Sequence, residues 1–89
     1  KYGKSSNVGA IEQRIRRTVY KALQNIASLG IEDYSNEIFQ KYSTSLFDFE
    51  EVRKQMNQIK GSSMYGGKIN VKKFVEGIIA WLKSDELEI

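Results

Sequence analysis

Cysteine and histidine are both missing from this chain. Without cysteine there are no disulfides, no thiolate chemistry and no cysteine-ligated metal centre. Without histidine the commonest general base and metal ligand are lost as well. No apolar run approaches the ~20 residues that cross a bilayer, and no signal peptide opens the chain. We therefore expect a cytoplasmic protein that is not an enzyme and uses neither a metal nor another cofactor.

What the chain does have is the composition of one small globular domain. It contains 89 residues, of which 40% are hydrophobic and 28% charged, a balance that argues against disorder. Because it begins with Lys1 rather than methionine, we expect residues 1–89 to be a single helical domain from a longer protein. Proline is absent, so glycine is the main residue expected to end helices.

Positive charge is concentrated at one end. Residues 1–21 hold six basic residues and one acidic residue, whereas residues 22–89 hold eight and ten. Residues 84–89 form an acidic tail. Such a basic end predicts an anionic partner, with nucleic acid first and an acidic protein or a membrane surface second. A solvated helix face without a partner is the alternative.

Apolar residues recur every three or four positions between Val8 and Leu29, which predicts an amphipathic helix over residues 8–29. Cap-type side chains precede it and Gly30 follows it, as expected for a helix start and stop. The expected caps are Ser5, Ser6 and Asn7.

Three further helices are predicted. Asp33 is the expected cap of the second helix, and Asp48 with Glu51 forms a capping-box variant at the start of the third. Gly61 is the expected end of the third helix, and residues 61–67 are predicted to be a loop. Asn70 is the expected cap of the last helix, which is apolar over most of its circumference and is therefore expected in the centre of the core.

The fold class expected from this pattern is all-α, a compact four-helix domain related to helix-turn-helix proteins. The aromatic residues expected in its core are Phe39, Tyr42, Phe47, Phe49 and Phe74, joined by Trp81. The inward apolar residues expected in the second and third helices are Tyr34, Ile38, Val52, Met56 and Ile59.

The helix over residues 8–29 carries a basic face opposite its apolar stripe. Arg14, Arg17 and Lys21 cluster there, with Gln13 beside them. Arginine can bond guanine in bidentate fashion and glutamine can do the same to adenine, so this face suits a helix in a DNA major groove. It equally suits a basic amphipathic helix that docks an acidic protein groove. The expected phosphate contacts are Lys4, Ser5, Ser6, Arg14 and Lys21.

Residues 5–19 resemble the recognition helix of a bacterial effector domain, the C-terminal DNA-binding domain of the master sporulation response regulator of endospore-forming bacteria. The positions that fall on the family pattern are Ile11, Glu12, Ile15, Arg16 and Arg17. Residues 36–44 and the set Gly67, Lys68, Asn70, Phe74, Val75 and Leu82 are similar to two later helices of that family. Together the matching segments cover about half the chain.

The resemblance implies an all-helical domain whose helix-turn-helix places its second helix in the major groove. It implies base contacts from Glu12 and Arg16, and a base or backbone contact from Arg17. The family's basic residue after the glutamate is Gln13 here, which we also expect to face bases. Residues 48–60 add a helix that the family does not need, and the first helix of the motif would precede residue 1.

We therefore expect a DNA-binding module of a bacterial transcriptional regulator, with residues 8–29 reading the major groove. Its expected partners are double-stranded DNA and either a second copy of the chain or an N-terminal domain, with no membrane and no small-molecule substrate. The alternative is a helical protein–protein interaction module whose basic helix docks an acidic partner.

Overall fold

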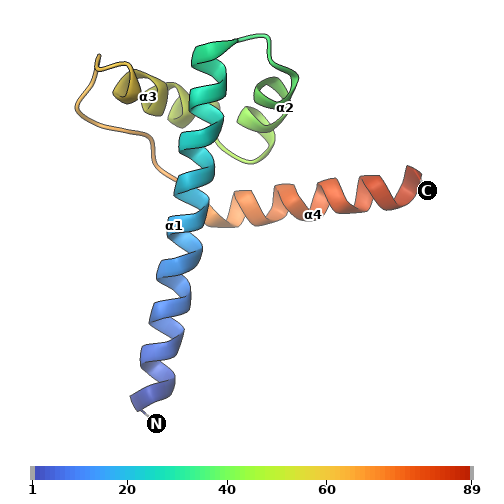
Figure 1. Ribbon diagram of the computed structural model, residues 1–89. Coiled ribbons are helices and arrows are strands. Elements are labelled where there is room, and N and C mark those ends of the chain that lie inside the picture. The colour runs from blue at the N-terminus through green and yellow to red at the C-terminus, as the bar shows by residue number, and fades with distance from the viewer. Residues whose placement is uncertain (1, 89) are drawn as a thin grey trace.

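The protein is an all-α domain of four helices, as predicted (Figure 1). The computed structural model describes the backbone of residues 2–88 and the side chains of residues 8–84. The helices are α1 (Tyr2–Glu32), α2 (Glu37–Ser45), α3 (Phe49–Ile59) and α4 (Val71–Glu88). No strand occurs within residues 2–88.

The core lies where α2 and α3 pack against the C-terminal half of α1. Its buried hydrophobic residues are Val19, Leu23, Ile26, Ala27, Phe39, Leu46, Phe47, Val52 and Met56. The predicted aromatic core is confirmed in five of its six members, since Phe39 and Phe47 are fully enclosed and Tyr42, Phe49 and Phe74 pack against them. Tyr34, Ile38 and Ile59 are exposed, which contradicts their predicted inward positions.

Helix α1 is longer at both ends than predicted. It starts at Tyr2, so the backbone of Ser5, Ser6 and Asn7 is helical and these residues do not cap it. Gly30 was predicted to stop the helix but lies inside it. The glycine is needed for another reason, because a Cβ at this position would lie 2.6 Å from Cδ1 of the buried Phe39 ring. Residue 30 is therefore a point of close helix–helix approach.

One further predicted cap is wrong, and another is confirmed only in its position. Asn36, not Asp33, caps α2, and its side chain accepts hydrogen bonds from the backbone N–H groups of residues 38 and 39 at 2.9 and 3.1 Å. Asp33 instead accepts from the backbone and hydroxyl of Ser35 in the preceding turn. Asp48 lies at the start of α3 but makes no side-chain cap hydrogen bond, so the predicted capping box with Glu51 does not form.

Two other local predictions are confirmed. Gly61 follows α3 with a φ of 85°, a left-handed conformation that L side chains rarely adopt. Asn70 caps α4 by accepting from the backbone N–H of Lys73 at 3.1 Å. Residues 60–70 contain no helix or strand and form the linker between α3 and α4.

Helix α4 is not the centre of the core, which contradicts the prediction for the last helix. It touches α1 and α2 through one side, with Phe74 and Ile78 packed on the core and Gly77 against the end of α2. Beyond these contacts it extends away from the molecule (Figure 1). Trp81 is exposed and not in the core. The residues predicted as an acidic tail, up to Glu88, continue the helix.

Two helical segments therefore project from the packed part of the domain (Figure 1). We call residues 2–18 of α1 the α1 arm and residues 75–88 of α4 the α4 arm. The radius of gyration, 15.2 Å, exceeds the ~12 Å typical of a packed domain of this length. The molecule is also flat, with extents of 49 × 44 × 16 Å.

Candidate nucleic-acid interface

The polar face of α1 lies in solvent over its whole length from residue 10 to residue 18. The predicted contact residues on it, all exposed, are Glu12, Gln13, Arg14, Arg16, Arg17 and Lys21. Within residues 8–84 none of the four basic side chains makes an ion pair. Glu12 and Arg16 are four residues apart, yet they too form no ion pair in that part of the chain. The positive charge of this face is therefore free to meet an anionic partner.

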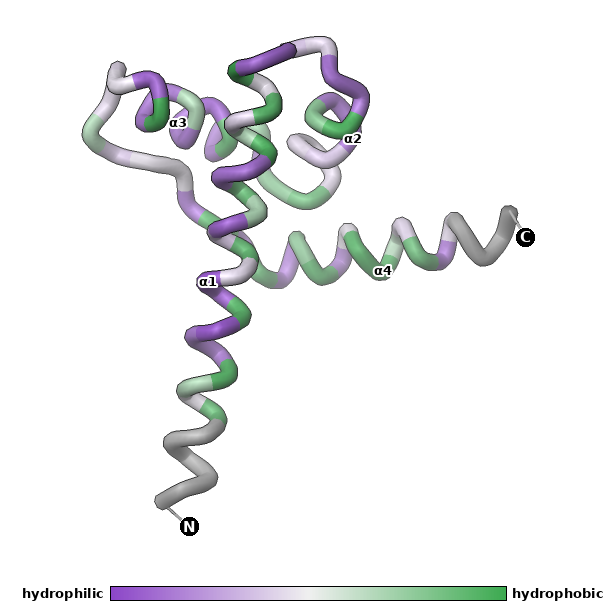
Figure 2. Tube along the Cα trace, in the orientation of Figure 1, coloured by the Kyte–Doolittle hydropathy of each residue, from purple (hydrophilic) through white to green (hydrophobic). Residues whose placement is uncertain are grey.

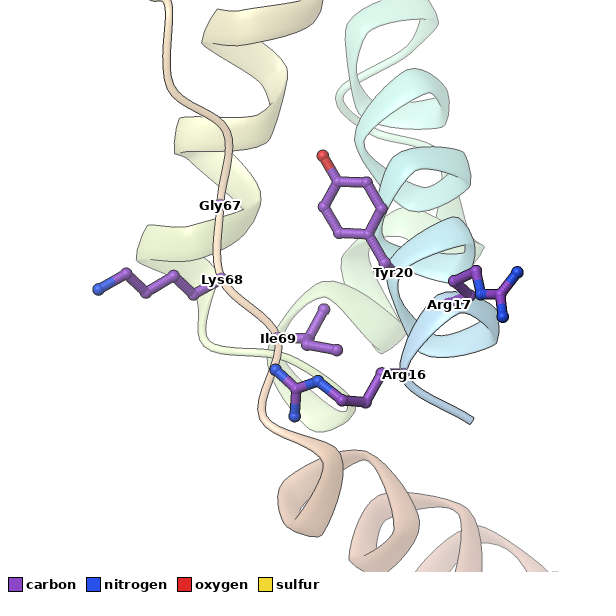
Figure 3. Close-up of a pocket in the computed structure, with 6 residues that line it drawn as sticks. All are labelled: Arg16, Arg17, Tyr20, Gly67, Lys68 and Ile69. Carbon is purple, nitrogen blue, oxygen red and sulfur yellow. The ribbon is translucent and has the colours of Figure 1, made fainter. Parts of the chain in front are cut away.

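Arg16 lines a cleft between α1 and the linker (Figure 3). The cleft has a volume of about 410 Å³, and its other lining residues are Arg17, Tyr20, Gly67, Lys68 and Ile69. In the close-up Arg16 reaches toward the linker, whereas Arg17 points away from it. The two arginines therefore serve different sides of α1. Lys68 also lines the cleft, but its side chain extends from the linker away from α1 (Figure 3).

The linker is held in this position by a polar stripe on α3. Glu51, Gln55 and Gln58 follow one another at spacings of four and three, so they share one face of the helix. The Glu51 Oε1 atom accepts from the backbone N–H of Lys68 at 2.8 Å, and Gln55 Oε1 accepts from that of Gly67 at 3.0 Å. These contacts fix the chain direction immediately before Ile69.

The same stripe is linked to its neighbours. The Gln58 side-chain amide donates to the carbonyl of Met64 at 3.2 Å, and the buried Gln55 lies 3.5 Å from the Tyr20 hydroxyl. The hydrogen bond from the Lys68 backbone N–H holds the pKa of Glu51 below its usual range, against the opposing effect of burial, and the hydrogen bond and charge of Lys54 act in the same direction. Glu51 is therefore a charged anchor for the linker.

The structure separates the predicted contact residues into groups. Arg17 and Lys21 share a shallow hollow of about 270 Å³, whereas Arg14 lines another one with Phe74 and Val75 of α4. Three predicted phosphate contacts, Lys4, Ser5 and Ser6, have side chains outside the described residues.

Lys68 is a basic residue beside this face that the sequence reasoning did not include among the contacts. It lies 52 positions after Arg16, in a loop whose path depends on the α3 stripe. The spacing of Glu51, Gln55 and Gln58 was a visible signal, since polar residues at i, i+4 and i+7 mark one helix face. It does not by itself indicate which segment lies on that face.

Other site types find no support in the described residues. No group of three acidic side chains that could hold a metal ion occurs among them. None of their helices combines the length and apolar character that a membrane crossing requires.

Comparisons with known proteins point to a regulator-related domain. The model of the YcbB domain family matches residues 1–78. The transcriptional regulatory protein GlnL of Bacillus subtilis is 39% identical over an alignment of 69 residues, which covers 74% of this chain. The chain spans 22% of the length of that relative. No solved structure matches the chain significantly.

Proposed function

The chain belongs to the YcbB domain family, and from that premise we propose that it is the DNA-binding module of a bacterial, cytoplasmic transcriptional regulator. One observation carries the proposal. Arg14, Arg16, Arg17 and Lys21 stand on an exposed helix face without an ion pair among the described residues. Phosphate groups are the natural partners of such a face, since neutralising them releases counterions.

The shape of the α1 arm suits a major groove. A helix with its side chains is ~10–12 Å wide, and the groove is ~12 Å wide. At 100° per residue, the order around the helix is Glu12, Arg16, Gln13, Arg17, Lys21 and Arg14. We assign the first four, which span an arc of ~140°, to base edges. Lys21 and Arg14 follow on the flank of that arc and are assigned to phosphates.

Lys68 extends this assignment. The cleft that it lines with Arg16 opens beside the proposed base-reading arc, and its side chain extends from the linker away from α1, so its ammonium group would meet a phosphate on the linker side of that arc (Figure 3). We add Lys68 to the proposed phosphate contacts, together with Lys4, Ser5 and Ser6 from the sequence. The name of the relative, a transcriptional regulatory protein, and the resemblance to a sporulation effector domain both support this function.

A pair of matched double variants tests the proposal. Arg16→Ala with Arg17→Ala removes two charges from the proposed interface. The control, called the α3 variant, is Arg53→Ala with Lys60→Ala, which removes one charge from α3 and one from the residue that follows it. Both side chains are exposed and form no ion pair within residues 8–84. Binding is measured by fluorescence anisotropy with a labelled duplex.

We expect the α1 variant to weaken binding by about 1–3 kcal/mol or more, roughly 5- to 150-fold. The α3 variant changes the net charge equally and should bind within about twofold of the parent. Equal losses in both variants would mean that only the net charge matters, and the interface would be wrongly placed.

Docking to an acidic protein groove is the second candidate function. Exposed Ile11 and Ile15 lie next to the basic face, and a helix with adjoining apolar and basic surfaces suits such a groove. The same assay separates the two functions, because no binding to duplex DNA at ~50 mM salt would favour the protein partner.

A further inference from the structure

Both arms of the molecule expose a stripe of large apolar side chains. On the α1 arm Val8, Ile11 and Ile15 are 65%, 52% and 44% exposed. On the α4 arm Val75, Ile79 and Leu82 are 44%, 47% and 51% exposed. Figure 2 shows hydrophobic residues continuing along α4 well beyond its contact with α1. Contiguous apolar surface of this kind marks an interaction site.

The stripe on α1 is the outer half of a pattern that is buried further along. Val8, Ile11 and Ile15 lie on the same side of the helix as Val19 and Ile26, which belong to the core. From Val19 toward the N-terminus this side becomes more exposed: Ile15 still meets α4 at a hollow, whereas Ile11 and Val8 are more than half exposed. The sequence therefore builds a packing surface along all of α1, and the domain itself fills only one half of it.

The two stripes have matching spacing. Ile15 and Val75 line one hollow of about 250 Å³ where the arms meet. From that point toward the N-terminus, the α1 stripe continues at Ile11 and Val8, at spacings of four and three residues. Toward the C-terminus, the α4 stripe continues at Ile79 and Leu82 with the same two spacings. Both stripes therefore extend ~10.5 Å at 1.5 Å per residue.

Because α1 runs toward the junction and α4 runs away from it, the match is that of an antiparallel helix pair. Such a pair would place Ile15 opposite Val75, Ile11 opposite Ile79 and Val8 opposite Leu82. Steps of three and four residues are also those of a coiled-coil seam.

The two arms of one chain are held apart. Gly77 lies so close to α2 that a Cβ would be 2.6 Å from the carbonyl oxygen of Ser45 and 2.7 Å from a methyl carbon of Leu46. The Phe74 ring lies 5.6 Å from that of Phe47 in the core. These contacts fix the base of α4 on α2. Its stripe lies beside the contact side, ~40–100° around the helix from Ile78. A partner for each stripe must then come from outside the chain.

We propose that the partner is a second copy of this chain, paired by reciprocal exchange of the arms. A twofold axis along the bisector of the two arms interchanges their directions, so each α4 arm lies along the α1 arm of the other copy. One such interface is isologous and buries all four stripes of the pair. The flat shape of the molecule, 16 Å in its shortest extent, allows two copies to stack in this way.

Charge supports the same pairing. The sequence gives the outer end of α1 a basic residue, Lys4, and no acid before Glu12. It gives the last turns of α4 three acids, Asp85, Glu86 and Glu88, against one basic residue, Lys83. An antiparallel pair of arms brings these two ends together, and opposite charges near each other favour association.

The proposal does not depend on DNA binding. Arg17 and Lys21 lie on the side of α1 opposite the stripe, so a second copy on the stripe leaves them free. Association and DNA binding can therefore be measured separately, and either can fail alone.

The first test is the mass of the chain in solution without DNA, by sedimentation equilibrium over a range of concentrations. We expect a dimer, twice the 10.2 kDa of one chain. Ile79→Glu and Ile11→Glu should each raise the dimer dissociation constant by more than about tenfold, because they bury a charge in the pair. The matched controls Ala80→Glu and Ala10→Glu are at exposed positions that adjoin Ile79 and Ile11 in sequence but lie on other helix faces, and they should change it by less than about twofold.

The second test uses the absence of cysteine. One sample carries Ile11→Cys alone and another carries Ile79→Cys alone, and the two are mixed under mild oxidation. We expect a disulfide-linked heterodimer that forms faster than either homodimer, and no such preference between Ala10→Cys and Ala80→Cys. Circular dichroism confirms that each variant is helical, since none of these residues is in the core.

A monomer at all concentrations would overturn the proposal. So would a dimer that survives both Ile79→Glu and Ile11→Glu, or a cross-link without preference for the Ile11–Ile79 pair.

Discussion

Replacing Gly30 by alanine should raise the stability if residue 30 is an ordinary helix position, and lower it if the glycine is needed for the close approach of Phe39. In an ordinary helix interior this change gains about 1 kcal/mol, because glycine is the poorer helix former. Here the added methyl group meets three atoms of the Phe39 ring, including Cδ1 at 2.6 Å and Cζ at 2.7 Å. Contacts below 3.0 Å require the ring to move, and the ring is fully buried.

The ring also has little room to move. Tyr34 and Phe49 flank it with centroids 5.2 and 6.4 Å away. We therefore take the cost of overpacking at its upper end, about 3 kcal/mol. Subtracting the helix gain of about 1 kcal/mol leaves a net loss of about 2 kcal/mol. For a domain of this size the melting temperature should fall by roughly 8–16 °C.

Thermal and urea unfolding followed by far-ultraviolet circular dichroism measure this change. Gly9→Ala is the matched control, because no atom lies within 4 Å of a Cβ there, and it should not lower the stability. In a Phe39→Leu background Gly30→Ala should cost less, so the double-mutant cycle should show coupling between the two sites. A Gly30→Ala protein as stable as the parent would refute the close approach of α1 and α2.

Three further changes test other parts of the structure. The lowered pKa of Glu51 means that its carboxylate stabilises the fold above the usual carboxyl range, and that this stabilisation is lost as the pH falls through the folded-state pKa. Glu51→Gln should therefore weaken the loss of stability on acidification, measured by urea unfolding at several pH values. An unchanged pH profile would contradict the role of Glu51 as a charged anchor. Gly77→Val should push α4 off α2 and raise amide hydrogen exchange in residues 71–80 while α3 stays protected; unchanged protection of α4 would contradict the tight contact with Ser45. Lys21→Ala should weaken binding to all DNA sequences alike and reduce the salt slope by about one unit; a loss confined to one sequence would contradict its assignment to a phosphate.

The sequence predicted those features of the fold that depend on residues within one helical turn. Asn70 and Gly61 act on the backbone beside them, so their roles could be read directly. Gly30 could not, because its position after the last apolar residue suited a helix stop equally well. The need for glycine there comes from Phe39, nine residues later, whose placement depends on the fold. Likewise, the Glu51 carboxylate accepts a hydrogen bond from the backbone N–H of Lys68 in the linker and does not form the capping box predicted with Asp48.

The core and the arms show a second limit. A helix that is apolar on most sides, such as α4, needs a partner surface, but hydropathy does not say whether that surface belongs to the same chain. The aromatic positions of α2 and α3 were predicted correctly, whereas Trp81 was not. In the candidate site the exposed arginines of α1 were expected, but Lys68 joined them only through tertiary contacts of its own backbone.

The central claim is that the basic face of α1 binds DNA, and a salt titration of binding to duplex DNA tests it most directly. Each phosphate contact contributes a slope of about −0.9 in the logarithm of affinity against the logarithm of salt concentration. With the basic residues of α1 and Lys68 in contact, we predict a slope of several units and measurable binding at ~50 mM salt. A slope near zero, or no binding at that salt concentration, would contradict the claim and leave this face for a protein partner.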